Sequence, residues 1–412
     1  GALQRKGSEY QAGNGLPKTS AGILQPKARV GSLTALATDA AEEWSSRGYP
    51  PQGWALGQNP AYRPSAQIIC KVVLRFTRLC GCLPHMLTEF SSAASPRKVI
   101  VACMRNEALF VVEWVAHHLA IGFDHIVVYS NDCDDGTDAI LDLLAESGRV
   151  SHFDNPGPYP AGSIQKQALE RAYALKLVKQ ADWVLHIDAD EYVNVVVGQR
   201  KIDDLIALHP EADAIALMWR HFGSAGKKTW EGGSVVESFI RCEGKLPDVE
   251  NGELANFKTL FRPSRFRMMG VHTPKLPRKK HVPVVVNAAG GLLPNDKLLT
   301  KAGSGYAATA AQLTWDNALL HHHHVKSDDL HVMKHARGDA NGRKNTKRVI
   351  GSDFYRYADR NDVFSKSLVR FRPKVVPWET KLRAIPGVIA AEAQAWAWFR
   401  ANFAAITQEQ AG

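Results

Sequence analysis

The sequence predicts an α/β fold in which a mostly parallel sheet is covered by helices on both faces. Between residues 98 and 188, short β-branched or apolar runs alternate with longer stretches of helical spacing, an order typical of βαβ units. Polar clusters follow three of the apolar runs, and they read "RNE", "SNDCDDGT" and "DADE". Ligands bind beyond the carboxyl ends of parallel strands, so these clusters predict a binding site at one edge of the sheet.

The individual elements can be read in chain order. "KVIVACM" is the first strand, "NEALFVVEWVAHHLAIG" is a helix with a glycine stop at Gly122, and "HIVVYS" is the second strand. Thr137 can cap the next helix, "DAILDLLAESG". "RVSHFD" is a third strand, "SIQKQALERAYALKLVKQ" is a long helix and "WVLHID" is a fourth strand. Together they form the parallel half of the predicted sheet.

Two further regions complete the organisation. After about Asp213, apolar runs such as "AIALMWRHFG" and "FKTLFR" predict strands between Gly- and Pro-rich loops, and residues 346–412 have helical spacing. Residues 1–97 are rich in Gly, Ser, Ala, Pro and Gln, which predicts a largely disordered extension. We therefore expect a folded domain over 98–345, with a helical region over 346–412 that packs on it.

Much of the positive charge falls in this extension. The chain has a net charge of +10, and residues 1–97 hold 11 Lys and Arg against 5 Asp and Glu. The extension lacks the interleaved aromatic side chains that single-stranded nucleic acids stack on, so no nucleic-acid partner is expected. Between residues 68 and 90, Lys71, Arg75 and Arg78 recur beside apolar residues. That pattern favours contact with an anionic membrane surface over a membrane span.

The six cysteines bear on the compartment. They show neither C-x-x-C pairs nor a dense framework, so the sequence predicts neither a zinc module nor a disulfide scaffold. We expect a reducing compartment, and therefore a cytoplasmic protein that residues 68–90 would hold at the inner membrane surface.

The stretch "WVLHIDADEY" carries the clearest chemical signal. Asp188 and Asp190 leave a buried-looking strand one residue apart, and Glu191 follows at once. Carboxylates this close repel one another unless a cation compensates them. Hard divalent cations such as Mg²⁺ take oxygen ligands and neutralise a departing diphosphate. The alternative is that the aspartates only cap a turn or a helix.

These motifs, taken together, resemble a known family. "CMRNEALFVVEWVAHHLAIGFDHIVVYSNDCDDGT", "WVLHIDADEY", "WRHFG", "FKTLFR" and "GVHTPK" are similar to the bacterial family-2-type glycosyltransferases, in the branch related to glycosyltransferase family 92. The resemblance covers roughly residues 98–366. It implies a GT-A fold, with a Rossmann-like nucleotide-binding half and a mixed acceptor half. It also implies a nucleotide-sugar donor, with UDP-sugars favoured, a hydroxyl acceptor such as a glycan, and Mn²⁺ or Mg²⁺.

The resemblance also implies roles for individual residues. Nucleotide-binding positions would be Arg105, Asn106, Glu107, Asn131, Asp132 and Gln165. Metal ligands would be Asp188 and Asp190, with His272 and His322 as candidates for a further ligand. An inverting transfer also needs a carboxylate base, for which Glu237 is selected from several glutamates. Trp219 and Phe222 are candidates for stacking on an acceptor sugar.

Three other functions stay open at this point. A Mg²⁺ phosphohydrolase also carries Asp-x-Asp after an apolar strand, but normally on its first strand. A nucleotidyltransferase would share the nucleotide-binding half. A degenerate domain that only binds sugar or an anionic surface belongs to a different class, and nucleotide binding that depends on metal would argue against it.

Overall fold

The computed structural model describes residues 97–159, 163–293, 309–338 and 349–411. The predicted disordered extension, apart from residue 97, and the predicted membrane contact over 68–90 lie outside the described residues. Within the described ranges, no helix is both long enough and apolar enough to cross a membrane.

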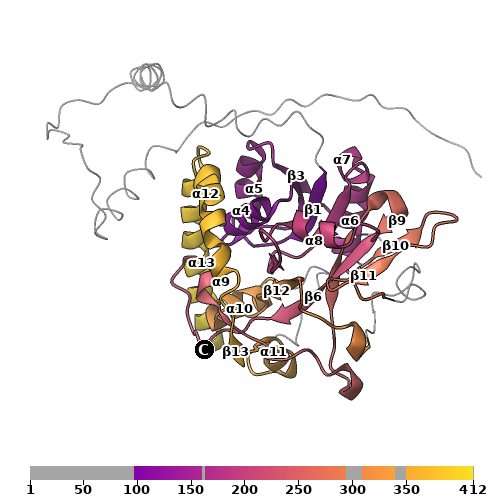
Figure 1. Cartoon of the computed structure of the whole chain (residues 1–412). Coiled ribbons are helices and arrows are strands. Elements are labelled where there is room, and N and C mark those ends of the chain that lie inside the picture. Colours follow the sequence, from indigo (N-terminus) through magenta and orange to yellow (C-terminus); the bar gives the residue numbers. More distant parts are fainter. Residues whose placement is uncertain (1–96, 160–162, 294–308, 339–348, 412) are drawn as a thin grey trace, which may run out of the picture. The chain divides into compact units, whose positions relative to one another are not determined.

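A mixed sheet with the strand order β3-β2-β1-β4-β8-β6-β12-β5 forms the centre of the fold, and β11 also pairs with β6 (Figure 1). Its strands are β1 (Lys98–Met104), β2 (His125–Ser130), β3 (Val150–Asp154), β4 (Trp183–His186), β5 (Glu191–Val195), β6 (Ala214–His221), β8 (Phe257–Phe261), β11 (Val285–Asn287) and β12 (Ala318–His322).

The sheet has a parallel half and a mixed half. β1 pairs in parallel with β2 and β4, and β2 pairs in parallel with β3. β8 runs antiparallel to both β4 and β6. β12 is parallel to β6 but antiparallel to β5. The predicted α/β class, with a mostly parallel sheet between helices, is confirmed.

Helices cover both faces of the sheet. One face packs against α4 (Val111–Ile121) and α5 (Thr137–Ala145), on which α12 (Arg372–Arg383) and α13 (Val388–Ala411) pack as an outer layer. The other packs against α6 (Ile164–Ala174) and the β9–β10 hairpin (Phe266–Met269 and Pro274–Pro277), with α7 (Lys176–Lys179) beside them. Figure 1 shows α12 and α13 lying along one side of the sheet.

Strand β1 shows why its sequence is apolar without alternation. Ile100 and Met104 point into the core under α4, whereas Val99 and Val101 point into the core under α6. A strand buried on both faces reads as a continuous apolar run. The same reasoning applies to β2 and β4, whose residues are all buried.

The remaining elements are short and surround the sheet. They are β7 (Arg241–Cys242), β13 (Val363–Phe364), α8 (Ile202–Leu208), α9 (Val235–Ser238), α10 (Asp328–Ala336), α11 (Asp353–Ala358) and 3₁₀ turns at Val249–Asn251, Pro263–Arg265, Ala310–Gln312 and Val369–Phe371.

Three boundary predictions have different outcomes. The glycine stop is confirmed, because α4 ends at Ile121 and Gly122 adopts a left-handed φ of 113°. The cap at Thr137 is wrong by one residue: Gly136 is the N-cap, and Asp135 accepts from the Thr137 backbone amide at 2.9 Å. The helix expected over 163–180 is split at Leu175, whose ψ of 137° is extended.

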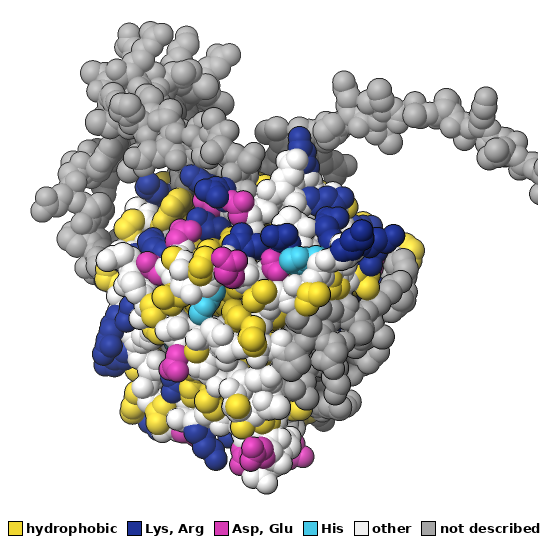
Figure 2. All heavy atoms as spheres, turned by 45° about the vertical axis from the view of Figure 1, so that its right-hand side comes forward, with side chains coloured by type: hydrophobic (Ala, Val, Ile, Leu, Met, Phe, Trp, Pro, Cys, Tyr) yellow, Lys and Arg dark blue, Asp and Glu magenta, His cyan; other side chains and the backbone are white. Residues whose placement is uncertain are grey.

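Figure 2 shows one face of the molecule, on which Lys and Arg side chains gather among Asp and Glu. Residues 98–412 hold 40 Lys and Arg against 36 Asp and Glu. Residues 98–412 as a whole therefore lack a strong excess of one sign, such as favours binding to nucleic acid.

Candidate functional site

The polar residues of the candidate site come together at one edge of the sheet. The carboxyl ends of β4, β6 and β12 lie at this edge, and the antiparallel strands β5 and β8 begin there. A cavity of about 630 Å³ opens at this position. Its lining includes Arg105, Glu107, Gln165, Asp188, Asp190, Trp219, His221, His322, His324, Lys334, Arg337, Asp353 and Tyr357.

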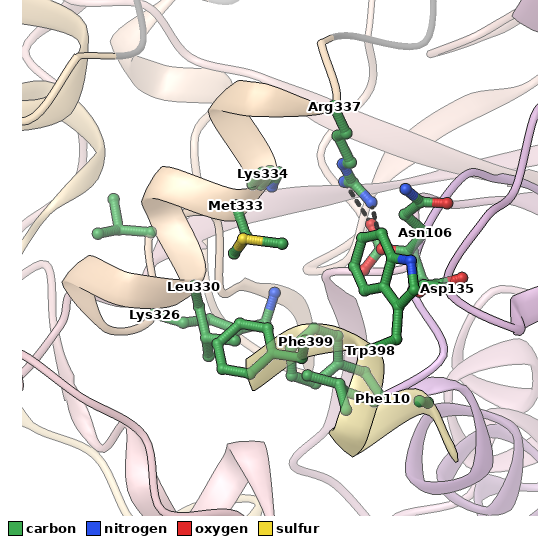
Figure 3. Close-up of a pocket in the computed structure, with 14 residues that line it drawn as sticks. Asn106, Phe110, Asp135, Lys326, Leu330, Met333, Lys334, Arg337, Trp398 and Phe399 are labelled. Atoms are coloured by element: carbon green, nitrogen blue, oxygen red, sulfur yellow. Dashed lines mark hydrogen bonds and ion pairs between the residues drawn. The ribbon is translucent and has the colours of Figure 1, made fainter. Parts of the chain in front are cut away.

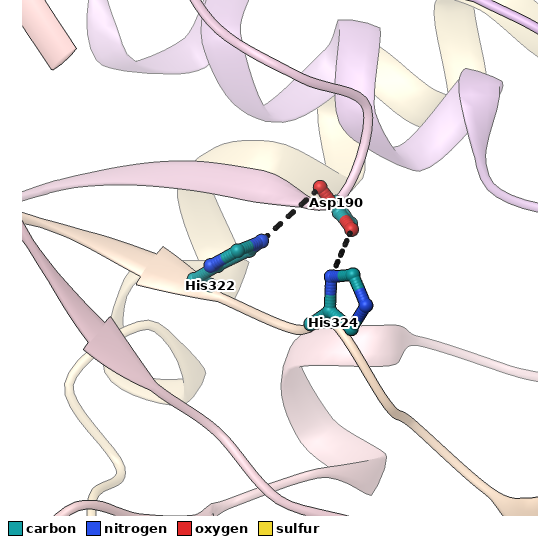
Figure 4. Close-up of side chains that lie close together, drawn as sticks. All are labelled: Asp190, His322 and His324. Carbon is teal, nitrogen blue, oxygen red and sulfur yellow. Dashed lines mark ion pairs between the residues drawn. The ribbon is translucent and has the colours of Figure 1, made fainter. Parts of the chain in front are cut away.

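Asp190, His322 and His324 form a compact cluster (Figure 4). His322 Nε2 is 3.6 Å from Asp190 Oδ1, and His324 Nδ1 is 3.7 Å from Asp190 Oδ2. The three candidate ligand atoms lie within 4.8 Å of one another. One buried carboxylate and two imidazoles at this spacing suit a divalent transition metal.

Strand pairing fixes this cluster in place. His322 pairs with Glu191 of β5 and with His221 of β6, so it lies beside the turn that carries Asp190. The backbone amide of His323 donates to the carbonyl of Asp190 at 2.9 Å. Side chains alternate along an extended chain, and His322 and His324 therefore face Asp190 while His321 and His323 face away.

The outward pair of histidines has a structural environment. His321 stacks on Phe222 with ring centroids 4.1 Å apart and contacts Asn194 Nδ2 at 2.9 Å. His323 is buried, and neither of its ring nitrogens has a partner among the described residues. The four adjacent histidines thus divide into two that face the site and two that pack in the core.

Asp188 lies beside a buried lysine. Lys258 Nζ on β8 donates to Asp188 Oδ2 at 2.9 Å, and Gln165 Nε2 donates to Asp188 Oδ1 at 3.0 Å. Burial alone would raise the pKa of Asp188, but the charge and hydrogen bond of the Lys258 ammonium, together with His186, outweigh burial and lower that pKa to about 2. Asp188 is therefore ionised, with its charge compensated from inside the protein.

Glu191 has a different role in the same turn. Its Oε2 accepts from the Asp188 backbone amide at 2.9 Å and lies 3.8 Å from Lys258 Nζ. The residue is fully buried, and burial raises the pKa of Glu191 well above its usual range. A carboxyl group that favours its protonated form relieves the repulsion among the three acids.

The segment 326–337 supplies three cations that sequence reasoning missed. Lys334 Nζ donates to Asp190 Oδ2 and to the carbonyl of His324, the latter at 3.1 Å. Arg337 donates to Glu107 Oε1 at 2.5 Å and to the carbonyl of Asn106 at 2.7 Å. Lys326 is buried, with its ammonium 4.4 Å from the centroid of the Phe110 ring. One signal was available in the sequence: a spacing of three places Lys334 and Arg337 on one helix face.

The predicted nucleotide loop lies at the cavity, and its members differ in position. Arg105, Glu107 and Gln165 line the cavity. The Asn106 side chain instead holds the loop after β2, where its Oδ1 accepts from the Asp134 amide at 3.1 Å. Beyond β2, Asn131 is buried and Asp132 is exposed, and their side chains meet at 3.1 Å. Their predicted role in holding the base stays a prediction.

Of four other predicted residues, Trp219 lines the cavity, whereas His272, Phe222 and Glu237 do not. The ring centroid of Trp219 is 4.3 Å from that of His322. His272 is outside the three-residue cluster, and its Nδ1 contacts the carbonyl of Phe257 at 2.9 Å. Phe222 is 1% exposed and packs on His321 instead of lining the cavity.

Glu237, the predicted catalytic base, lies on α9 away from the cavity. Its side chain is 49% exposed, and its Oε2 pairs with Arg372 Nε at 3.3 Å. A base must reach the acceptor hydroxyl, so this position argues against Glu237.

Comparison with known proteins points to one family. Residues 99–293 match the family model of glycosyltransferase family 92. The chain is 26% identical over 132 residues to a glycosyltransferase family 92 protein of Oryza sativa subsp. japonica, covering 31% of this chain and 22% of that protein. It is 27% identical over 153 residues to one of Ricinus communis, covering 36% of this chain and 27% of that protein. The chain thus spans only about a quarter of the length of these relatives and is related to their family.

Solved structures are more distant. The mannosyltransferase PcManGT of Pyrobaculum calidifontis, in complex with GDP-Man and Mn²⁺, is 15% identical with a TM-score of 0.23, covering 35% of this chain and 45% of that one. Residues 1–349 of S. aureus TarS are 15% identical with a TM-score of 0.27, covering 41% and 47%. Likenesses this distant are no basis for assigning a ligand or a substrate.

Proposed function

We propose that this chain is a metal-dependent glycosyltransferase of the GT-A type, which moves a sugar from a nucleoside-diphosphate sugar to an acceptor hydroxyl. The observation that carries the proposal is the convergence of Asp188 and the Asp190, His322 and His324 cluster on one cavity at the sheet edge. The relation to glycosyltransferase family 92 supports the same reaction class.

The residues of the cluster fit a divalent metal. His322 Nδ1 is buried and has no partner in the part of the chain that the structure describes, while its Nε2 faces Asp190. Mg²⁺ prefers oxygen ligands throughout, whereas imidazole nitrogens suit transition metals. We therefore favour Mn²⁺ over Mg²⁺, held by Asp190, His322 and His324. Such a metal supplies charge neutralisation for the leaving diphosphate.

The donor would occupy the cavity next to this cluster. A volume of about 630 Å³ lies within the range typical of small-molecule sites, about 300–1,000 Å³. Arg105, at the carboxyl end of β1, has a buried Nε without a partner among the described residues, and it is available to a phosphate or a ribose hydroxyl. Gln165 holds Asp188 in position. UDP-sugars stay the favoured donors.

The acceptor would bind in the part of the cavity that Trp219 and Asp353 line. Trp219 offers an aromatic face at the cavity wall, on which a sugar ring can stack. Among the lining carboxylates, Glu107, Asp188 and Asp190 pair with cations that are at most 14% exposed. Asp353 pairs instead with Arg356, whose side chain is 65% exposed. We therefore place the general base at Asp353 rather than at Glu237.

Thermal unfolding tests the proposal. UDP, GDP and CDP are each added with and without Mn²⁺ to the native chain and to Asp190→Asn, with the surface variant Asp203→Asn as the matched control. Ligand at about 100 times its dissociation constant adds roughly 2.7 kcal/mol to stability, which is a shift of a few degrees. We expect a shift that needs Mn²⁺, is largest for UDP, survives in the control and is lost in Asp190→Asn.

No shift with any of the three nucleotides would contradict the proposal. The phosphohydrolase and the non-catalytic binding module would then become the better readings. Release of inorganic phosphate from a generic phosphomonoester would distinguish those two.

A further inference from the structure

Lys334 lies where a metal on Asp190 and His324 would have to bind. Its ammonium donates to Asp190 Oδ2, lies 3.4 Å from His324 Nδ1 and reaches the His324 carbonyl at 3.1 Å. A divalent metal would bind through the same carboxylate oxygen and the same imidazole lone pair, at about 2.0–2.2 Å from each. One lone pair cannot serve both cations, so the ammonium and the metal compete.

The carboxylates that line the cavity are already paired with cations without any metal. Each lining carboxylate has a cationic partner: Glu107 with Arg337, Asp188 with Lys258, Asp190 with Lys334 and Asp353 with Arg356. A divalent cation at the buried Asp190 would add positive charge to a cavity that Arg105 also lines. A diphosphate is the ligand whose charge would offset that addition.

The Lys334 side chain has free space beside it into which it can move. Lys334 lines both the large cavity and a small adjoining one of about 50 Å³. The second cavity is bounded by Lys326, Arg337 and apolar side chains from α10 and α13 (Figure 3). A lysine has four rotatable side-chain bonds and a compact ammonium, so it can leave Asp190 and remain next to the same space.

We infer that Lys334 holds the metal position in the metal-free protein, and that a divalent cation displaces its ammonium from Asp190 toward the diphosphate of the donor. The inference rests on the proposed function, since it needs the metal at Asp190. Metal and nucleotide then bind cooperatively through one side chain. Each raises the affinity for the other by the same factor, because linkage between two sites is reciprocal.

Calorimetric titration of Mn²⁺ without nucleotide tests the first half. Lys334→Met removes the competing charge, and the Mn²⁺ dissociation constant should fall by about tenfold, within the 5- to 150-fold range typical of coupled sites. Lys334→Gln, which keeps hydrogen-bonding groups, should move in the same direction and serves if the methionine variant does not fold. Lys228→Met, whose side chain is 82% exposed, is the matched control and should leave Mn²⁺ affinity unchanged.

Titration of UDP at saturating Mn²⁺ tests the second half. Loss of a charge-assisted hydrogen bond to phosphate should weaken UDP binding to Lys334→Met by about tenfold. The same substitution therefore has opposite effects on the two ligands. A merely structural lysine would weaken both.

Asp190→Asn separates failure of this inference from failure of the proposed function. If Asp190→Asn loses Mn²⁺ binding while Lys334→Met binds Mn²⁺ no better than the native chain, Lys334 does not compete and the inference is overturned alone. If Asp190→Asn binds Mn²⁺ as well as the native chain does, the metal centre itself is misplaced, and both proposals fail. Unchanged UDP affinity in Lys334→Met would overturn the displacement toward the diphosphate.

Discussion

Asp353 and Glu237 differ in what surrounds each carboxylate. Asp353, at the start of α11, lines the cavity. Glu237, on α9, pairs with Arg372 of α12 and does not line the cavity. A general base contributes about 10²- to 10⁴-fold to the rate. Asp353→Asn should therefore lower kcat by about that factor and leave UDP affinity unchanged. Glu237→Gln, the matched control, should keep the native kcat.

The measurement is release of nucleoside diphosphate from a panel of UDP-sugars in the presence of simple acceptor sugars, with UDP affinity measured separately. If Glu237→Gln shows the larger loss of kcat, the base lies outside the cavity lining and Asp353 only stabilises the N-terminus of its helix.

At the scale of elements, successive side chains of β12 and of the two residues after it point alternately into the core and toward the site. His324 faces Asp190, while His323 is buried with both ring nitrogens lacking partners within the described ranges. His324→Leu should abolish the Mn²⁺-dependent rise in melting temperature. His323→Leu should keep that rise, and it should not lower the free energy of unfolding, because it removes buried polar atoms without partners.

Thermal unfolding with and without Mn²⁺ gives the change in melting temperature of the two variants, and urea unfolding gives their free energies of unfolding. Equal loss of the Mn²⁺ effect in both would mean that the register of this segment differs from the one described. Loss of stability in His323→Leu alone would indicate a hydrogen-bond partner for its ring.

The position of each site residue relative to its strand or helix determines whether the sequence could reveal it. Asp188 and Asp190 are visible because they directly follow an apolar strand, and the order of strands predicts which sheet edge they reach. The cations that neutralise them come from β8 and α10, and they are 70 and 144 residues away from their partners along the chain. No periodic pattern specifies such pairings. Glu237 illustrates the same limit, since its helical neighbours do not reveal that it points toward Arg372.

At the scale of the whole molecule, buried histidines make stability depend on pH. His117 and His118 of α4 are buried between that helix and β5, and His117 also lies near Arg372 and Glu379 of α12. Burial lowers the pKa of His117 to about 4 and that of His118 well below its usual value. His118 Nε2 accepts from the Val193 amide at 3.3 Å, a bond that a protonated ring would lose.

The direction of the pH effect follows from these shifts. Below about pH 6.5 these two histidines bind protons in the unfolded chain but not in the folded one, so their contribution to the free energy of unfolding decreases as the pH falls from about 6.5 toward 4. Each histidine contributes up to about 1.4 kcal/mol per pH unit in that window. Urea unfolding between pH 4 and 8, in the native chain and in His118→Leu, measures the slope. The variant should have the shallower slope, and a slope equal to that of the native chain would mean that His118 is protonated in the folded protein.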